Sequence, residues 1–549
     1  MVGDGSQRRP EKINLIQQMR KPKPKSRQRM ATIKPARNGR SAERMLAELK
    51  QRLREISDLT ATGDVLNWDQ ATYMPQGGAD ARARQCSALY RLAHEQAVAP
   101  ALGKLLDALV RFGESLPHDS DDASLIRVAR RDFQRMNKIP PDHVARANAH
   151  GSASYNAWTQ ARPANDFAAM VSYLERALDL SREYSSYFAP YNHVADPHID
   201  HADEGMTTAS IRKIFGELKP KLVPMVCAIC EQPALDDSSL RQAFPKAAQF
   251  EFALNLAQRL GYDFARGRLD LTHHPFSTRF STGDVRITTH LNENNLRDAL
   301  FSTLHEAGHA MYEQGVSVAL DGTPLGKGVS AGVHESQSRL WENVVGRSYG
   351  FWNHFYPLLR RIFPQQLESA SLAVFHRAIN KVAHSTVRTD ADELTYNLHI
   401  MLRFDLELQL LEGKLRVKDL PEAWRVAMRA NLDVAPHDDR DGCLQDVHWY
   451  SGYIGGRFQS YTIGNILSAQ FYAAALQAHP DIPKEIATGE FSTLHAWLRH
   501  NVYRHGSKFA PNDLIKRVTG AAMSMTPYFD YLREKYAELY RLPEALWAR

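Results

Sequence analysis

Two histidines and a glutamate in the stretch His305-Glu306-Ala307-Gly308-His309 have the spacing of a metal-dependent hydrolytic site. Residues four apart lie about one turn apart on the same face of a helix, so both imidazoles can reach one metal ion. A zinc ion lowers the pKa of its bound water and polarises a carbonyl, while an adjacent carboxylate can accept the proton of that water. The motif therefore predicts that His305 and His309 bind a metal and that Glu306 is the general base.

A zinc site of this kind needs a third protein ligand. The extended motif with a third histidine is excluded, because Tyr312 and Gly315 stand where its glycine and histidine would be. Two acids remain, Glu335 and Glu342, on a helix expected at 334–345 after the glycine-rich loop 322–332. Glu335 is the preferred ligand from its place near the start of that helix, and Glu342 is the alternative.

The elements that must position these side chains are predicted to be mostly helical. From residue 41 onward, apolar residues recur at three- and four-residue steps, which is the pattern of amphipathic helices. The segment 391–411 is apolar enough to be buried on most sides, opens with acids at 390–393 and ends at Gly413. The periodicity predicts one helix that starts near residue 41. It predicts further helices over 167–183, 246–260, 295–314, 391–411, 464–477 and 528–541.

One strand is evident in the sequence, at 284–291, where Val285 and Ile287 alternate with polar residues. It comes directly before the helix that carries the metal motif. The sequence has no internal repeat, and no glycine- and serine-rich linker divides it after residue 40. We therefore expect a mainly α fold, with one large helical domain over residues 41–549 and a short β element beside the motif helix.

The composition agrees with an ordinary globular protein. Of 549 residues, 43% are hydrophobic and 24% are charged, which argues against a fibrous, membrane-embedded or wholly disordered chain. No apolar run approaches the 18 to 20 residues that a membrane span requires, so no membrane association is expected. Four cysteines are too few for a disulfide scaffold and favour a reducing compartment, for which the cytoplasm is the expectation.

A basic tail precedes the predicted domain. Residues 1–40 contain 12 lysines and arginines but two acids, so the net charge of +6 becomes about −4 for residues 41–549. The tail is expected to be disordered, and the preferred interpretation is that translation starts at Met30. It has no apolar stretch for a secretory signal, although organellar targeting stays open. The charge of the body gives no reason to expect nucleic acid as a partner.

Further motifs lie in order on both sides of the metal motif. HEAGHAMYEQG at 305–315 is followed by HESQ at 334–337. Together with five further segments, these two resemble, in sequence and in order, the motifs of the Taq-type thermostable metallocarboxypeptidase family. The resemblance extends over nearly the whole body, to Asn465. The other matching segments are LNWDQATYMPQGG (66–78), HPF (274–276), DVRIT (284–288), VRTDADE (387–393) and GCLQDVHW (442–449).

The resemblance implies a mostly helical fold with a deep substrate groove and a small β-sheet beside the motif helix. It also implies one divalent metal, removal of C-terminal residues from peptides with a free carboxylate, and a homodimer. Zinc is the expected metal, and cobalt or manganese are compatible with the same ligands. The reaction expected is hydrolysis of the C-terminal peptide bond by a metal-bound water that Glu306 activates.

The resemblance also assigns roles to individual residues. It makes His305, His309 and Glu335 the metal ligands and Glu306 the base, and it makes Arg388 the residue that binds the C-terminal carboxylate of the substrate. A guanidinium pairs with a carboxylate through two hydrogen bonds, which suits this task. The remaining expected substrate-binding residues are His274, which would close the groove, Asp284 and Arg286, which would align the peptide or only pair with each other, and Gln445, Asp446 and His448.

The sequence departs from the family at one point. Where many members carry Gly-Tyr-Phe-Pro, Arg457 replaces the tyrosine and Gln459 replaces the proline. Tyr461, Tyr453 or Arg457 are the candidates for the missing role of transition-state donor. Two other functions are alternatives: an aminopeptidase or oligoendopeptidase with the same metal chemistry, and a non-catalytic protein whose basic tail binds nucleic acid or acidic lipid.

Overall fold

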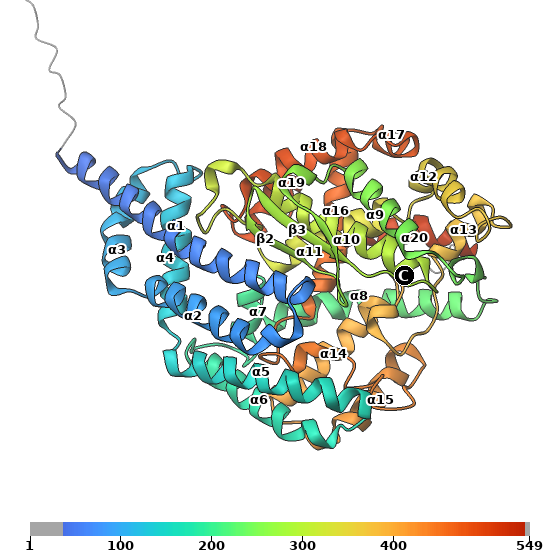
Figure 1. Ribbon diagram of the computed structural model, residues 1–549, viewed down its shortest axis with the longest axis horizontal. Coiled ribbons are helices and arrows are strands. Elements are labelled where there is room, and N and C mark those ends of the chain that lie inside the picture. The colour runs from blue at the N-terminus through green and yellow to red at the C-terminus, as the bar shows by residue number, and fades with distance from the viewer. Residues whose placement is uncertain (1–36, 544–549) are drawn as a thin grey trace, which may run out of the picture.

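The helical periodicity of the sequence produces a mainly helical molecule (Figure 1). The computed structural model describes residues 37–543, with side chains from residue 41, so the predicted basic tail lies outside the described residues except for its last four positions. Within that range there are twenty α-helices and three short strands. Their bounds are α1 Arg37–Thr72, α2 Ala79–Ala97, α3 Pro100–Ser115, α4 Asp121–Asn137, α5 Pro141–Ala164, α6 Val171–Ser186, α7 Asp196–Ala202, α8 Thr208–Cys230, α9 Lys246–Leu260, β1 Leu269–Leu271, β2 Ser277–Ser281, β3 Asp284–Thr289, α10 Leu296–Gly315, α11 Ala331–Arg339, α12 Tyr349–Ile362, α13 Leu372–Ile379, α14 Tyr396–Leu411, α15 Leu420–Leu432, α16 Gln459–Ala478, α17 Ile482–Thr488, α18 Ser492–Asn501, α19 Pro511–Thr519 and α20 Thr526–Tyr540.

The first four helices form one side of the molecule, drawn in blue at the left of Figure 1. The apolar stripe of α1 is buried, with Leu49 fully enclosed, and it packs with the apolar faces of α3 and α4. Leu320 and Leu325, from the loop after α10, complete this smaller core. The loop that leads to α11 is therefore anchored against the N-terminal helices.

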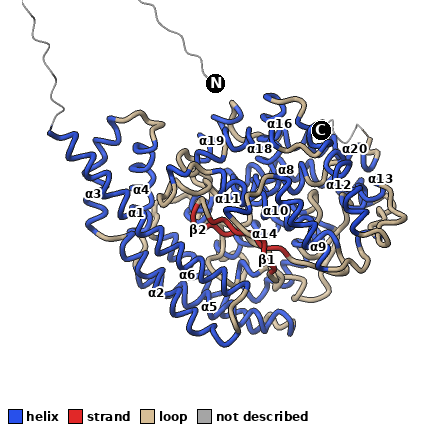
Figure 2. Tube along the Cα trace, turned by 45° about the horizontal axis from the view of Figure 1, so that its top comes forward, coloured by secondary structure: helices blue, strands red, loops and turns tan. Residues whose placement is uncertain are grey.

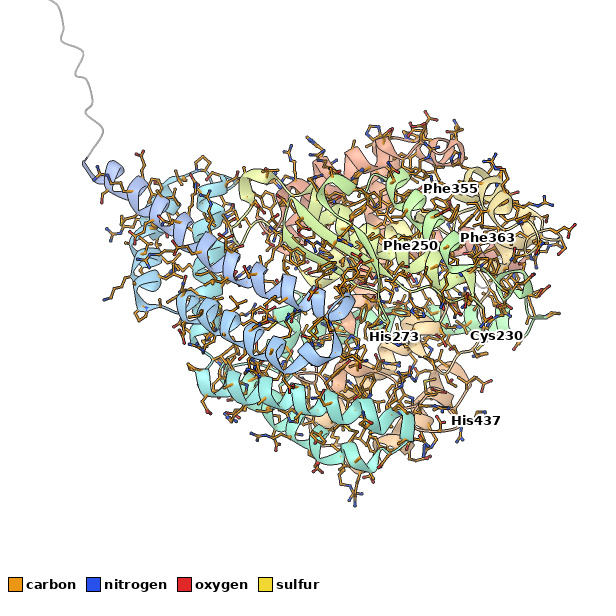
Figure 3. The ribbon with its side chains drawn as sticks, viewed as in Figure 1. Cys230, Phe250, His273, Phe355, Phe363 and His437 are labelled. Atoms are coloured by element: carbon orange, nitrogen blue, oxygen red, sulfur yellow. The ribbon has the colours of Figure 1, made fainter. Side chains whose placement is uncertain are left out.

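The larger core lies among the remaining helices, where side chains such as Phe355 of α12 and Phe363 directly after it fill the interior (Figure 3). Helix α14 is buried on almost every side, as its composition predicts. It begins at Tyr396, however, and not at residue 391. The carboxylate of Asp392 accepts hydrogen bonds from the backbone of Leu394 and Thr395, and this turn delays the helix.

The three strands form one small sheet in the order β1-β3-β2 (Figure 2). The predicted strand is the central one, parallel to β1 and antiparallel to β2, and Val285 and Ile287 are buried as expected. It ends at Thr289, two residues earlier than predicted. Because β2 contacts α1 and β3 contacts α10, the sheet connects the N-terminal helices with the motif helix. The prediction of a mainly α fold with a small sheet beside that helix is confirmed.

Helices α10, α11 and α16 pack at unusually short distances because glycines face their neighbours. A Cβ atom at Gly308 of α10 would lie 2.7 Å from the backbone oxygen of Gln337 in α11. A Cβ atom at Gly464 of α16 would lie 2.5 Å from Cγ of Glu335. The helix expected at 334–345 is in fact α11, which starts at Ala331, followed by a π-helical segment, Leu340–Val345. No helix in the described part of the chain is long and apolar enough to cross a bilayer.

Candidate metal centre and active site

The ligand atoms of His305, His309 and Glu335 converge between α10 and α11. The three ligand atoms all lie within 4.8 Å of one another. Oε2 of Glu335 is 4.0 Å from Nε2 of His305 and 3.5 Å from Nε2 of His309. The one-turn spacing on α10 thus places both imidazoles toward the same carboxylate, and α11 supplies that carboxylate from the side.

Each histidine is oriented through its other ring nitrogen. Nδ1 of His305 lies 2.9 Å from Oε2 of Glu342, and Nδ1 of His309 lies 2.6 Å from Nδ1 of His334. His334 in turn bonds to Glu313 at 2.8 Å. Glu342, the alternative third ligand, therefore orients His305 from the side away from the triad. Partners of this kind fix the ring and increase its basicity toward a metal.

Burial and charge hold Glu335 and His309 in the forms that a metal requires. Burial would raise the pKa of Glu335, but the charges of Arg339 and of the two histidines outweigh it and keep this pKa below its usual range. Arg339 also donates a hydrogen bond of 2.7 Å to Oε1 of Glu335. Burial lowers the pKa of His309 to about 4, which keeps its imidazole neutral at physiological pH. Neutral imidazole and ionised carboxylate are the ligand forms that bind a metal.

Glu306 is buried beside the triad, with 6% of its surface exposed. Burial raises its pKa to about 7, against the attraction of His305 and with added repulsion from Glu335. A carboxylate poised near neutrality is suited to accept a proton and release it again.

A divalent metal fits this donor set. The ligands are two nitrogens and one oxygen, the combination of catalytic zinc sites that keep one position open. The Nδ1 atoms of His305 and His309 already have hydrogen-bond partners, so their Nε2 atoms remain available to bind a cation. Three carboxylates, Glu306, Glu335 and Glu342, surround the site, and a cation would relieve their repulsion.

A second charged cluster surrounds Arg388, which is buried in a turn before α14. The carboxylate of Asp446 accepts two hydrogen bonds from Arg388, at 3.0 and 2.7 Å, and one from Arg403 at 2.5 Å. The side-chain oxygen of Gln445 accepts from the backbone of Arg388 and from Arg403. Two guanidinium groups share one carboxylate, so the cluster has a net positive charge.

The cluster lies close to the triad. Nη1 of Arg388 donates to the hydroxyl of Tyr396 at 2.8 Å, and Arg339 stacks on the ring of Tyr396 at 4.5 Å. Since Arg339 also bonds to Glu335, one tyrosine and one arginine separate Arg388 from this candidate metal ligand. A guanidinium has five N–H donors and three of those of Arg388 are used, which leaves two for a substrate.

His448 and His274 lie beside this cluster. Nδ1 of His448 is 3.0 Å from Oδ1 of Asp446, and its Nε2 is 3.1 Å from the hydroxyl of Tyr461. Desolvation, followed by the nearby charges of Arg388 and His448, lowers the pKa of His274. The predicted substrate-binding residues of the HPF, VRTDADE and GCLQDVHW segments thus gather in one place.

Asp284 and Arg286 form a pair of their own on β3. They bond to each other on β3 at 2.9 and 2.8 Å, which is the simple ion pair that was the alternative to a substrate role. The guanidinium of Arg286 stacks on Trp68 of α1 at 4.2 Å. Within the described residues neither side chain bonds to the metal triad, so this pair fixes α1 to the sheet.

Three residues are candidates for the transition-state donor that the family tyrosine would supply, and of these Tyr461 lies beside the Arg388 cluster. The guanidinium of Arg388 lies 5.3 Å from the centre of its ring, and its hydroxyl bonds to His448. Tyr453 instead bonds to the buried His143, at 3.0 Å, in a separate aromatic cluster. Arg457 is exposed.

Sequence reasoning missed several residues that complete the site. Asp446, expected among the substrate-binding residues, bonds to Arg388 and Arg403, and Glu342 and His334 orient the histidines. Arg339, Arg403 and Tyr396 were not identified at all. Arg339 could have been found, since it is four residues after Glu335 and therefore on the same helix face.

Comparisons with known proteins agree with this site. The family model of the carboxypeptidase Taq (M32) metallopeptidases matches residues 48–536. Thermostable carboxypeptidase 1 of Thermus thermophilus is 42% identical over 499 residues, which cover 89% of this chain and 97% of the relative. Carboxypeptidase 1 of Bacillus subtilis is 35% identical over 491 residues, with coverage of 89% and 97%.

Solved structures give the same result. The M32 carboxypeptidase from Deinococcus radiodurans has a TM-score of 0.88 and 50% identity, covering 91% of this chain and 100% of that one. Metallocarboxypeptidase 1 of Trypanosoma cruzi has a TM-score of 0.84 and 28% identity, with coverage of 91% and 100%. The chain belongs to the carboxypeptidase Taq (M32) metallopeptidase family, a family of divalent-metal enzymes, and the resemblance is confirmed. The aminopeptidase, oligoendopeptidase and non-catalytic alternatives are not favoured.

Proposed function

We propose that this metallocarboxypeptidase binds zinc through His305, His309 and Glu335 and hydrolyses the C-terminal bond of peptides with Glu306 as the general base. The observation that carries the proposal is the net positive cluster around Arg388, one tyrosine and one arginine away from the triad. An exopeptidase must recognise the charge of a terminal carboxylate, and the two free N–H groups of Arg388 suit this task. An aminopeptidase would instead need acids there to bind an amine.

The residues of the chain divide the reaction between them. When bound, the divalent metal supplies a water of lowered pKa and polarises the scissile carbonyl. Glu306 accepts the proton of the attacking water at its carboxylate and donates it to the amine of the leaving amino acid. Arg388 holds the C-terminal carboxylate, so that the last peptide bond, and no other, lies at Glu306. Tyr461 is the proposed donor to the oxyanion, because its hydroxyl lies beside the cluster.

The setting of the enzyme is also part of the proposal. The family resemblance supports a homodimer, with zinc in preference to cobalt or manganese. Four free cysteines suit the reducing cytoplasm, and the organellar targeting that a basic tail would allow stays open. The division into a tail at 1–40 and one catalytic domain at 41–549 stays a prediction.

The test uses purified full-length protein, one peptide with a free C-terminus and the same peptide amidated. We expect stepwise release of single C-terminal residues by mass spectrometry, loss of activity on chelation, and poor cleavage of the amide. Glu306→Gln should lower turnover at least about 100-fold while zinc content stays near that of the wild type, because the ligands survive. Cleavage of internal bonds, or equal cleavage of the amidated peptide, would overturn the proposal.

A further inference from the structure

The carboxylate of Asp203 is buried between the first turns of two helices that pack on each other, α11 and α16. The residue is 2% exposed. Its Oδ1 accepts a hydrogen bond of 2.7 Å from the backbone amide of Gly332, in the first turn of α11. Its Oδ2 accepts one of 2.6 Å from the hydroxyl of Ser460, in the first turn of α16. One side chain from outside both helices thus joins their N-terminal ends.

This junction lies one helical turn before the proposed metal ligand. Glu335 follows Gly332 by three residues on α11, and such residues lie on the same side of a helix. On α16, Gly464 follows Ser460 by four residues, and its Cβ position is the one that lies 2.5 Å from Cγ of Glu335. The two bonds of Asp203 therefore set the spacing of the helices directly before the point where α16 touches this ligand.

The first turn of α11 is also closely packed. A Cβ atom at Gly332 would lie 2.5 Å from Cγ2 of Ile463 in α16 and 2.8 Å from Oδ1 of Asp203. The hydroxyl of Ser330, the residue before α11, accepts a hydrogen bond of 3.2 Å from the amide of Val333. Asp203 and Ser330 thus each satisfy one of the amides that a helix leaves without an internal partner at its start. The direction of α11 depends on both.

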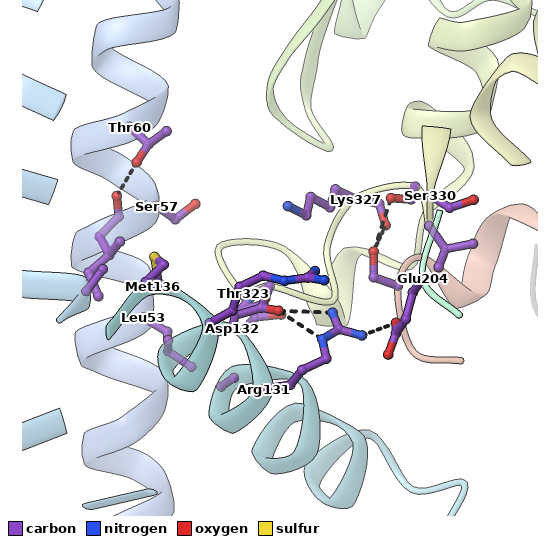
Figure 4. Close-up of a pocket in the computed structure, with 18 of the residues that line it drawn as sticks. Leu53, Ser57, Thr60, Arg131, Asp132, Met136, Glu204, Thr323, Lys327 and Ser330 are labelled. Atoms are coloured by element: carbon purple, nitrogen blue, oxygen red, sulfur yellow. Dashed lines mark hydrogen bonds and ion pairs between the residues drawn. The ribbon is translucent and has the colours of Figure 1, made fainter. Parts of the chain in front are cut away.

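Asp203 is itself held in place by its neighbours in the chain. It directly follows α7, and its amide donates to the backbone oxygen of the buried Ile199 at 2.8 Å. The next residue, Glu204, pairs with Arg131 of α4, as a dashed line in Figure 4 shows. The carboxylate is therefore a fixed point against which α11 and α16 are set.

We propose that Asp203 is a positioning residue for the metal centre, because it joins the first turns of α11 and α16 and so determines where the carboxylate of Glu335 lies. The inference rests on the proposed function, which makes Glu335 a metal ligand. The hydrogen bonds of Asp203 in the described part of the chain reach none of the three ligands, so its effect passes through the backbone of α11. Groups that orient a ligand from behind affect metal affinity without touching the metal.

The test measures zinc affinity with a competing chelator, and the visible spectrum of the Co²⁺-loaded protein, which reports on ligand geometry. Asp203→Ala removes the acceptor of both bonds, so we expect zinc to bind about tenfold more weakly and the Co²⁺ spectrum to change. Asp203→Asn keeps an oxygen that accepts from Gly332 and an amide that donates to Ser460. Its zinc affinity should therefore stay within about threefold of the wild type.

Asp196→Ala is the matched control. Asp196 is a buried carboxylate of α7 that accepts hydrogen bonds of 2.9 and 2.8 Å from the amides of His193 and Thr208. Thr208 begins α8, which carries none of the three ligands. We expect Asp196→Ala to lower the melting temperature of the metal-free protein, as Asp203→Ala does, but to leave zinc affinity and the Co²⁺ spectrum unchanged.

Ser460→Ala breaks only the bond to α16 and keeps the bond to α11. It decides the question if Asp203→Ala does not fold. We expect it to weaken zinc binding about threefold, less than the loss of both bonds.

The outcomes separate this inference from the proposed function. If the wild type binds no zinc, or Glu335→Ala binds it equally well, the proposed metal centre fails. If only Glu335→Ala weakens binding, while Asp203→Ala or, where that variant does not fold, Ser460→Ala keeps the affinity and spectrum of the wild type, Asp203 does not position the ligand.

Two further results would overturn the inference. An equal loss of zinc affinity in Asp196→Ala would trace the effect to a general loss of packing. A zinc affinity of Asp203→Asn as low as that of Asp203→Ala would show that the effect does not depend on the two hydrogen bonds.

Discussion

At the scale of single residues, the active site depends on groups that are charged although buried. Arg388, Asp446 and Glu335 are each mostly hidden from solvent, and each has a charged partner at hydrogen-bond distance. Burial of a charge without such a partner costs several kcal/mol, so these pairs hold one another in place. The net charge that remains, positive at Arg388 and negative at the triad, is what a carboxylate and a metal ion each require.

Replacement of Arg388 by lysine tests whether hydrogen-bond geometry, and not charge alone, binds the substrate. Lysine keeps the positive charge but lacks the planar fork that pairs with a carboxylate through two parallel hydrogen bonds. We expect kcat/KM for free-carboxylate peptides to fall about 10- to 100-fold, with weaker discrimination against amidated peptides. Arg416→Lys, at an exposed arginine, should leave both unchanged. Undiminished discrimination in Arg388→Lys would mean that another group binds the carboxylate.

A buried carboxyl outside the site makes stability depend on pH. Glu407 accepts hydrogen bonds from Trp449 at 2.8 Å and from Gly455 at 3.3 Å, and its other oxygen has no partner among the described residues. Burial raises its pKa to about 7, above the value of about 4.5 expected when the chain is unfolded. The unfolded chain therefore ionises first, and stability falls as pH rises from about 4.5 to 7.

Glu407→Gln should remove this contribution, which amounts to about 2 kcal/mol between pH 5 and pH 8. Melting temperatures across this range measure it: relative to the wild type, the variant should gain stability as the pH increases. If the melting curves of the two proteins shift in parallel with pH, Glu407 does not titrate in this range.

At the scale of elements, close approach of three helices fixes the position of Glu335, the proposed metal ligand from α11. The Cβ position of Gly464 on α16 lies 2.5 Å from Cγ and 2.7 Å from Cβ of Glu335. Gly464→Ala must therefore displace the ligand or the helix. We expect roughly a tenfold loss in zinc affinity and a destabilisation of about 1 to 3 kcal/mol.

A second glycine is the matched control. Gly216, inside α8, has no atom within 4 Å of its Cβ position, so Gly216→Ala should stabilise the protein by about 0.5 to 1 kcal/mol. Its zinc affinity, measured with a competing chelator, should equal that of the wild type. Equal zinc affinity in Gly464→Ala would show that α16 does not fix the position of Glu335.

The elements also show where prediction from the sequence succeeds. Periodicity places α9 at its observed bounds and the motif on α10, because a helix repeat is local information. The start of α14 was missed because a side-chain-to-backbone turn at Asp392 competes with the helix. Strand β3 was found from its alternation, while β1 and β2 are too short to show one.

In the functional site, too, the sequence predicts local relations but not contacts between distant segments. The relation of His305 to His309 follows from one helical turn, but the pairing of His305 with Glu342 spans 37 residues and that of Arg388 with Asp446 spans 58. Such contacts depend on tertiary packing that no local pattern records. The resemblance to a family supplied Arg388, and no rule of spacing could have done so.

At the scale of the whole molecule, charge is divided between the tail and the body. Residues 1–40 carry a net charge of about +10, and the rest about −4. The catalytic groups all lie in the body, and the first described buried side chain of α1 is Ala42. We therefore expect the tail to dominate binding of the full chain to negatively charged matrices, and the body to carry out the chemistry.

Deletion of residues 1–40 separates these two properties. The shortened protein should keep the kcat/KM of the full chain for an N-blocked dipeptide, and its melting temperature should change little, because the buried face of α1 is retained. Its net charge becomes negative, so it should no longer bind to a cation-exchange resin at pH 7, whereas the full chain should bind at low salt and elute as salt screens its tail. A large fall in turnover on deletion would contradict this division, since it would place part of the substrate site or of the folding core within the first 40 residues.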